Sequence, residues 1–146
     1  MGVLSDSEIL EYIERGWLRI DPFSEGSLGA AGYDLRSGSP LSLLPGTYCL
    51  AHTTERIELS GRICGQLLLR SSFAREGLVG SFALVDPGFR GQLTLSLSNF
   101  GPQAISIGEG ERLAQVVFMK MSRLPKKSYS GRYQDSTGAV GSRRKF

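Results

Sequence analysis

A carboxylate and an aromatic ring lie three residues apart in the segment Asp86-Pro87-Gly88-Phe89. Pro fixes φ at the second position of a turn, and Gly permits a positive φ at the third. The segment therefore predicts the tip of a β-hairpin, with an alternating strand leaving it. An acid and a ring at the two ends of one turn could share a small pocket, which suits a flat, hydroxylated ligand such as a nucleoside. On this segment alone, a plain hairpin with a solvated Asp86 is the simpler interpretation.

Three further groups carry polar chemistry. Arg70-Ser71-Ser72 would expose hydroxyls, backbone N–H groups and a guanidinium where a strand runs into a helical turn, and such groups bind phosphate. A serine that only caps a short helix explains the same residues equally well. Gln115, just before the apolar run 116–119, is either a positioned amide or a polar rim residue. Asp34 and Arg36 follow a turn-forming glycine and form either a site pair or a structural ion pair.

One helix and many short strands are expected to position these groups. Ser5 and Glu8 form a capping-box pattern, and an apolar stripe at helical spacing runs on to Gly16, where the helix should end. Nineteen glycines and six prolines separate the apolar runs that follow. Short strands at regular intervals predict a sandwich, jelly roll or barrel, and the run 116–119 should lie in its core. Runs typical of strands are 57–59, 63–69, 104–107 and 116–119.

The composition predicts one domain with a basic arm. A chain of 146 residues suffices for a single apolar core. The formal net charge is +3, and basic residues gather at 143–145. From about Pro125 onward apolar residues thin out, which predicts an arm that orders on a ligand or on a neighbouring subunit. Such an arm can bind nucleic acid, a membrane surface or the phosphates of a small ligand, and it can equally be a solvated terminus.

The cysteine and histidine content argues against a zinc site and an exported protein. Cys49 and Cys64 form no CxxC pair, and His52 is the only histidine. The N-terminus does not resemble a signal peptide, and no apolar run approaches the roughly 20 residues that span a bilayer. We therefore expect a cytoplasmic protein with reduced thiols.

The motifs together resemble one superfamily. The segments 31–35, 70–72, 85–91 and 110–115 resemble, in this order, four motifs of the trimeric deoxyuridine triphosphatases (dUTPases). The same superfamily contains the dCTP deaminases, and the N-terminal helix, the string 70–75 and the tail look more like that branch. The resemblance covers nearly the whole chain.

The resemblance implies a mainly β fold, a distorted β-barrel or jelly roll, with a short N-terminal helix. Residues 1–146 would form a single domain whose last part, 125–146, is a flexible C-terminal arm. It also implies a homotrimer with active sites shared between subunits. The motif segments lie far apart along the chain, which fits a site built from more than one copy.

One position separates the two activities of the superfamily. Deamination of cytosine needs an activated water and a group that carries protons to the leaving ammonia. The H-x-E and P-C-x-x-C signature of the zinc deaminases is absent here. The dCTP deaminases use no zinc and resemble this chain, except that a Glu stands at the position of Ser96. A serine cannot replace a carboxylate as general acid and base, and such a loss costs about 10²–10⁴-fold in rate.

Hydrolysis of dUTP to dUMP and pyrophosphate is the activity that the resemblance and Ser96 favour together. The alternatives are a dCTP deaminase, mono- or bifunctional, and a non-catalytic nucleotide-binding homologue. Asp86 would orient and deprotonate the attacking water, and Arg75 matches a site residue of the deaminases. The implied partner is dUTP rather than nucleic acid or a membrane, with Mg²⁺ held mainly by substrate phosphates and water. The residues implied to bind substrate are Arg70, Ser71, Ser72, Phe82, Phe89, Gln115, Tyr129, Arg132 and Ser136.

Overall fold

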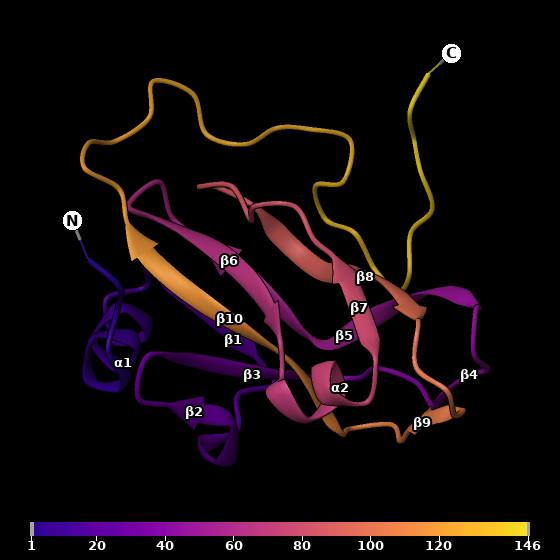
Figure 1. The fold of residues 1–146 in the computed structure, drawn as a ribbon. Coiled ribbons are helices and arrows are strands. Elements are labelled where there is room, and N and C mark those ends of the chain that lie inside the picture. The colour runs from indigo at the N-terminus through magenta and orange to yellow at the C-terminus, as the bar shows by residue number, and fades with distance from the viewer. Residues whose placement is uncertain (1, 146) are drawn as a thin grey trace.

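A computed structural model describes residues 2–145 and confirms the mainly β architecture (Figure 1). In chain order the elements are α1 (Asp6–Glu14), β1 (Leu18–Asp21), η1 (Glu25–Ser27), β2 (Leu28–Gly29), β3 (Gly32–Arg36), β4 (Leu41–Leu43), β5 (Tyr48–Leu59), β6 (Ile63–Leu69), α2 (Ser71–Arg75), β7 (Leu78–Ser81), β8 (Arg90–Asn99), β9 (Ile105–Ile107) and β10 (Arg112–Lys120). The strands form two four-stranded antiparallel sheets, with the orders β1-β5-β8-β7 and β2-β3-β10-β6, and a two-stranded ribbon of β4 and β9.

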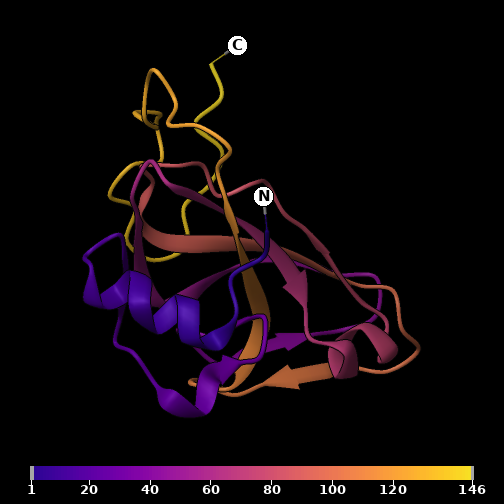
Figure 2. The same cartoon turned by 90° about the vertical axis from the view of Figure 1, so that its left-hand side faces the viewer.

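Helix α1 forms as its capping pattern predicts. The Ser5 side chain accepts a hydrogen bond from the backbone N–H of Glu8, and the Glu8 carboxylate accepts one from the backbone N–H of Ser5. The helix ends at Glu14, and Gly16 beyond it has a φ of +72°, which is the conformation that glycine adopts after a helix C-terminus. Figure 2 shows α1 on the outside of the strands.

The apolar core lies between the two sheets, because alternate side chains of each strand point into it. Strand β8 alternates along its whole length, with Leu93, Leu95 and Leu97 buried and their neighbours half-buried. Strand β10 alternates as well, so Val116 and Phe118 are fully buried, while the side chains between them lie on the opposite, half-buried face. The expectation that the whole run 116–119 lies in the core is therefore wrong for every second residue.

The two sheets do not close into a barrel within the described residues. Strands β6 and β7 are the outer strands of their respective sheets. An isolated bridge between Gly65 and Val85 links β6 to the loop that follows β7. The fold is thus a distorted, partly open pair of sheets, and the opening between β6 and β7 leaves backbone groups of both strands unpaired by the ladder.

The C-terminal segment after β10 runs across the molecule to the outer side of β8 (Figures 1 and 2). Residues 121–145 contain turns and bends, with a bridge that pairs Ser136 with Gly91. The part of this segment that the sequence predicts as the arm is described over residues 125–145. Its mobility remains a prediction. Over residues 2–145, no helix has the length and apolar character that crossing a membrane requires.

Candidate active site

The turn at Asp86 has the predicted local geometry. The backbone N–H of Phe89 donates to the Asp86 carbonyl at 3.0 Å, and Gly88 has a φ of +88°, as a turn with Pro second and Gly third requires. Strands β7 and β8 do form a hairpin, but its loop is long. Within that loop Val85 exchanges two backbone hydrogen bonds with Gly65 of β6, at 2.9 and 2.8 Å. The turn is therefore fixed from both sheets.

Asp86 and Phe89 line the same cavity, of about 440 Å³, as the pocket argument predicts. Volumes of this order hold small ligands in proteins. The Phe89 ring is buried and packs edge-on against Tyr129 of the arm, with 5.7 Å between the ring centroids. Arg132 lines the cavity too. Four of the predicted site residues, two from the turn and two from the arm, are thus brought together.

The Asp86 carboxylate is exposed and makes no hydrogen bond or ion pair with any residue between 2 and 145. Burial raises the pKa of the nearby Cys64 thiol, and the charge of Asp86 adds to that rise. A carboxylate at the wall of a cavity without a structural partner is available to a ligand or a water molecule.

A second group of predicted residues gathers where β3, β10 and the end of β6 meet. Asp34 forms ion pairs with Arg70, at 3.3 Å, and with Arg112, at 3.7 Å. Gln115 is the cross-strand partner of Asp34. Arg70 is also the residue that precedes α2, and Ser71 begins that helix. Asp34 therefore holds two guanidinium groups beside a glutamine and a helix start.

The serines of this group do not cap the short helix. The N-cap position of α2 is Arg70, which makes no side-chain capping bond. Ser71 and Ser72 are both exposed, and neither hydroxyl bonds to another residue in the described part of the chain. The interpretation that one of these serines caps the helix is therefore wrong, and both hydroxyls are exposed to solvent.

Gly32 matters for close packing rather than for a turn. A Cβ atom on Gly32 would lie 2.6 Å from the Val116 carbonyl oxygen and 2.9 Å from Nε2 of Gln115. The absent side chain lets Gln115 lie across β3. The preceding turn is made by residues 30–31, between β2 and β3.

Asp34 and Arg36 do not pair with each other. Nε of Arg36 lies 2.7 Å from the fully buried Glu55, whose carboxylate also accepts the Arg36 backbone N–H at 2.9 Å. The side-chain hydrogen bond from the Arg36 guanidinium to Glu55 raises the pKa of Arg36. Arg36 therefore has the structural role, and Asp34 belongs to the group with Arg70.

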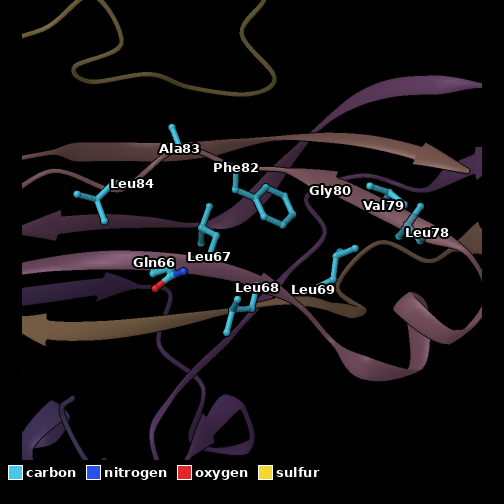
Figure 3. Close-up of a pocket in the computed structure, with 10 residues that line it drawn as sticks. All are labelled: Gln66, Leu67, Leu68, Leu69, Leu78, Val79, Gly80, Phe82, Ala83 and Leu84. Atoms are coloured by element: carbon cyan, nitrogen blue, oxygen red, sulfur yellow. The ribbon is translucent and has the colours of Figure 1, made fainter. Parts of the chain in front are cut away.

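Phe82 lies in a separate groove, of about 650 Å³, between the open edges of β6 and β7 (Figure 3). Its ring lies over Gly80, and a Cβ atom at Gly80 would overlap it. Apolar side chains are exposed along this groove: Leu68 by 44%, Val79 by 48% and Leu84 by 52%. Ala83 and Leu84 line both the groove and the Asp86 cavity, so the two hollows adjoin.

The remaining predicted residues lie apart from Asp86. Arg75 ends α2 and is exposed beside residues 102–105. Ser136 is buried, and its hydroxyl donates to the Tyr133 carbonyl at 2.6 Å. Ser96 is half-buried on the outer face of β8, between its cross-strand partners on β5 and β7. Thr94 lies on the same face and lines the Asp86 cavity. Ser96 is two residues further along the strand, about 7 Å from Thr94.

Within a single chain, the predicted site residues thus lie in two separate groups. The bridge at Gly65 places Asp86 near the start of β6, whereas Arg70 follows its end. The extended chain from Gly65 to Arg70 spans about 17 Å at roughly 3.4 Å per residue. The sequence interpretation missed Thr94 and Tyr133, which line the Asp86 cavity, and Arg112, which pairs with Asp34. The alternation of β8 was the available signal for Thr94.

Comparisons with known proteins agree with the fold and the motifs. A family model described as dCTP deaminase-like matches residues 37–121. The dCTP deaminase of Pyrococcus horikoshii is 43% identical over 141 residues, covering 86% of this chain and 90% of that protein. A probable deoxyuridine 5'-triphosphate nucleotidohydrolase of Sulfolobus islandicus rod-shaped virus 1 is 33% identical over 153 residues, covering 94% of this chain and 96% of that protein.

A solved structure confirms the fold. The crystal structure of 2'-deoxycytidine 5'-triphosphate deaminase from Agrobacterium tumefaciens matches with a TM-score of 0.70 at 19% identity, over 80% of this chain and 47% of that chain. Fold and motifs define a protein of the superfamily that contains the dUTPases and the dCTP deaminases. Within it, the chain belongs to the dCTP deaminase-like family.

Proposed function

We propose that this protein hydrolyses dUTP to dUMP and pyrophosphate. The observation that carries the proposal is the Asp86 carboxylate, which has no partner among the described residues and faces a cavity together with Phe89. A general base must reach a water molecule and must not be committed to a structural ion pair. For binding alone a neutral hydrogen-bonding side chain would serve better at this position, because the negative charge of a carboxylate repels the phosphates.

In this proposal water attacks the α-phosphorus. A bond forms between the water oxygen and the α-phosphorus, the bond to the bridging oxygen of pyrophosphate breaks, and the Asp86 carboxylate takes the proton. Asp86 also accepts a hydrogen bond from the 3'-hydroxyl. The Phe89 ring packs on the deoxyribose and leaves no room for a 2'-hydroxyl. Uracil is recognised by backbone groups of the loop 81–86.

A divalent metal fits this scheme as an ion that is coordinated by the substrate rather than by the protein. The described residues hold no cluster of three His, Cys, Asp or Glu side chains that could bind an ion alone. Mg²⁺ takes oxygen ligands and retains waters, so triphosphate oxygens would supply most of its coordination. When bound, the ion neutralises phosphate charge.

In this proposal a second subunit supplies the residues that bind the phosphates. These residues are Arg70, Ser71, Ser72 and Gln115. The span of about 17 Å along β6 separates them from Asp86 of their own chain. A homotrimer in which the exposed apolar residues of the β6–β7 groove meet another copy would bring the two groups together. Such a shared site agrees with the unpaired edges of β6 and β7. Two free cysteines fit a cytoplasmic location.

Deamination of dCTP is the second candidate, favoured by the 43% identity to a protein named dCTP deaminase. The chemistry that it requires is a carboxylate beside the base, and Ser96 stands at that position. Arg75, which matches the deaminases, lies away from the Asp86 cavity of its own chain. A subunit-shared site would have to supply the proton carrier from elsewhere, and we therefore favour hydrolysis.

Two incubations separate the candidates. The purified protein is mixed with dUTP or with dCTP in the presence of Mg²⁺, and pyrophosphate and ammonia are measured in parallel. Pyrophosphate from dUTP without ammonia from dCTP supports the proposal. Ammonia from dCTP assigns the deaminase activity instead, and the absence of both products contradicts both activities and favours the non-catalytic alternative.

A further inference from the structure

One charged residue of the arm, Asp135, binds two arginines of its own chain. The Asp135 carboxylate accepts hydrogen bonds from Arg90, at 2.9 and 3.1 Å, and from Arg56, at 2.7 Å. The Asp135 backbone N–H donates to the Arg90 carbonyl at 2.8 Å. Its φ of +59° is one that Asp and Asn tolerate better than most residues. Arg90 and then Arg56 hold the pKa of this carboxyl below its ordinary value.

Hydrogen bonds on both sides of Asp135, from the Gln134 side chain and the Ser136 backbone, reinforce the attachment. The Gln134 side chain accepts the Arg90 backbone N–H at 2.8 Å and donates to the Gly88 carbonyl at 2.8 Å. The backbone N–H of Gln92 donates to the Ser136 carbonyl at 2.9 Å. A Cβ atom on Gly91 would lie 2.9 Å from the Ser136 nitrogen, so the close approach depends on glycine.

Asp135 lies between two parts of the arm, one on the turn at Asp86 and one on the outer face of β8. Before it, Tyr129 packs on Phe89 and donates its backbone N–H to the Pro87 carbonyl at 2.9 Å. After it, the backbone N–H groups of Gly138 and Val140 donate to the side chains of Gln92 and Thr94, at 2.6 and 3.0 Å. Any movement of residues 134–136 would therefore move the walls of the Asp86 cavity.

We propose that Asp135 is a positioning residue, which fixes the arm over the Asp86 cavity of its own chain. It does so by binding Arg90 at the start of β8 and Arg56 in β5. It touches neither substrate nor reacting atoms, and acts through Tyr129 and Arg132. The proposal rests on the proposed function for its effect on substrate binding, but the attachment itself can be measured without any activity.

Hydrogen exchange of the full-length protein measures the attachment directly. Asp135→Asn keeps the turn preference and removes the charge, so arm amides 134–140 should exchange faster, by about two- to fivefold for the loss of an exposed ion pair. Arg90→Met should give a similar acceleration, and the double variant no more than either single one. Glu11→Gln, which removes an exposed partner of Arg15 on α1, is the matched control and should leave the arm unchanged. Unaltered arm exchange in Asp135→Asn overturns the proposal.

Steady-state kinetics distinguish positioning from a merely structural role. Because Tyr129 and Arg132 would bind the substrate, a loosened arm should raise KM for dUTP about two- to fivefold while kcat stays within about twofold. The urea midpoint of unfolding should not move. Faster exchange with an unchanged KM rejects the positioning role. If the unmodified protein does not hydrolyse dUTP, the proposed function fails while the exchange result still decides the attachment.

Mixed assemblies test whether the arm serves its own chain. Chains carrying Asp86→Asn are mixed and reassembled with chains carrying Tyr129→Ala and Arg132→Ala. If each arm covers the Asp86 of its own chain, no site in the mixture holds both intact parts, and activity stays at the level of the separate variants. Recovery of activity above that level shows that an arm serves another chain and contradicts the proposal.

Discussion

Replacing Asp86 with asparagine keeps the shape of the side chain and removes its ability to accept a proton from water. The carboxylate is exposed and unpaired among residues 2–145, so the free energy of unfolding should change by less than about 0.5 kcal/mol. Loss of a general base lowers kcat by about 10²–10⁴-fold, which corresponds to roughly 2.7–5.5 kcal/mol in the activation barrier. The variant should therefore separate catalysis from stability.

Binding should survive the same substitution. The asparagine amide can still bond the sugar hydroxyl, and the removed negative charge no longer repels the triphosphate. A non-hydrolysable dUTP analogue should therefore bind Asp86→Asn at least as tightly as it binds the unmodified protein.

The assays for Asp86→Asn are pyrophosphate release at saturating dUTP, calorimetric titration with the analogue, and urea unfolding. Glu14→Gln, an exposed carboxylate on α1, is the control for loss of one negative charge and should behave like the unmodified protein. Near-normal turnover in Asp86→Asn would refute the assignment of Asp86 as the base. A lowered unfolding midpoint would show that the carboxylate has a structural partner.

Three further outcomes follow from contacts elsewhere in the chain. Gly32→Ala should destabilise the fold by about 1–3 kcal/mol through overpacking against the Val116 carbonyl, whereas Gly108→Ala, with open space around it, should not; equal urea midpoints would contradict this. A hydrogen bond from Lys120 holds the pKa of the Glu8 carboxyl below its ordinary value, so the stabilisation is present above about pH 4.3 and lost as pH falls through the lowered pKa. Unfolding midpoints of Glu8→Gln and the unmodified protein should therefore converge only in acid, and a constant gap would exclude this linkage. Ending the chain before Tyr133 should strongly reduce dUTP turnover with near-unchanged circular dichroism, and full turnover would exclude a role of the arm in the site.

Local patterns predicted the parts of the molecule that local chemistry determines. The capping box of α1 and the turn at Asp86 each depend on residues within four positions of one another, and both form as expected. The pairing of Asp86 and Phe89 in one cavity follows from that turn. The run 116–119 was misinterpreted because four apolar residues in a row do not reveal which of them face outward.

Partners far apart in sequence could not be predicted in this way. Arg36 lies two residues from Asp34 along β3 yet pairs with Glu55, a buried carboxylate in the stretch of β5 where the register with β8 shifts. Asp34 instead pairs with Arg70 and Arg112, which reach it from the ends of two other strands. The attachment of Asp135 depends in the same way on where β5 and β8 begin and end.

Hydrolysis of dUTP in water enriched in oxygen-18 shows directly whether water attacks the α-phosphorus. If Asp86 activates a water for attack on the α-phosphorus, the label enters dUMP and pyrophosphate carries none, as phosphorus NMR or mass spectrometry of the products will show. A parallel sample with dCTP should release no ammonia, because the Ser96 hydroxyl cannot act as the general acid and base that deamination requires. Label in pyrophosphate, or ammonia from dCTP with dUTP left intact, would contradict the proposed reaction.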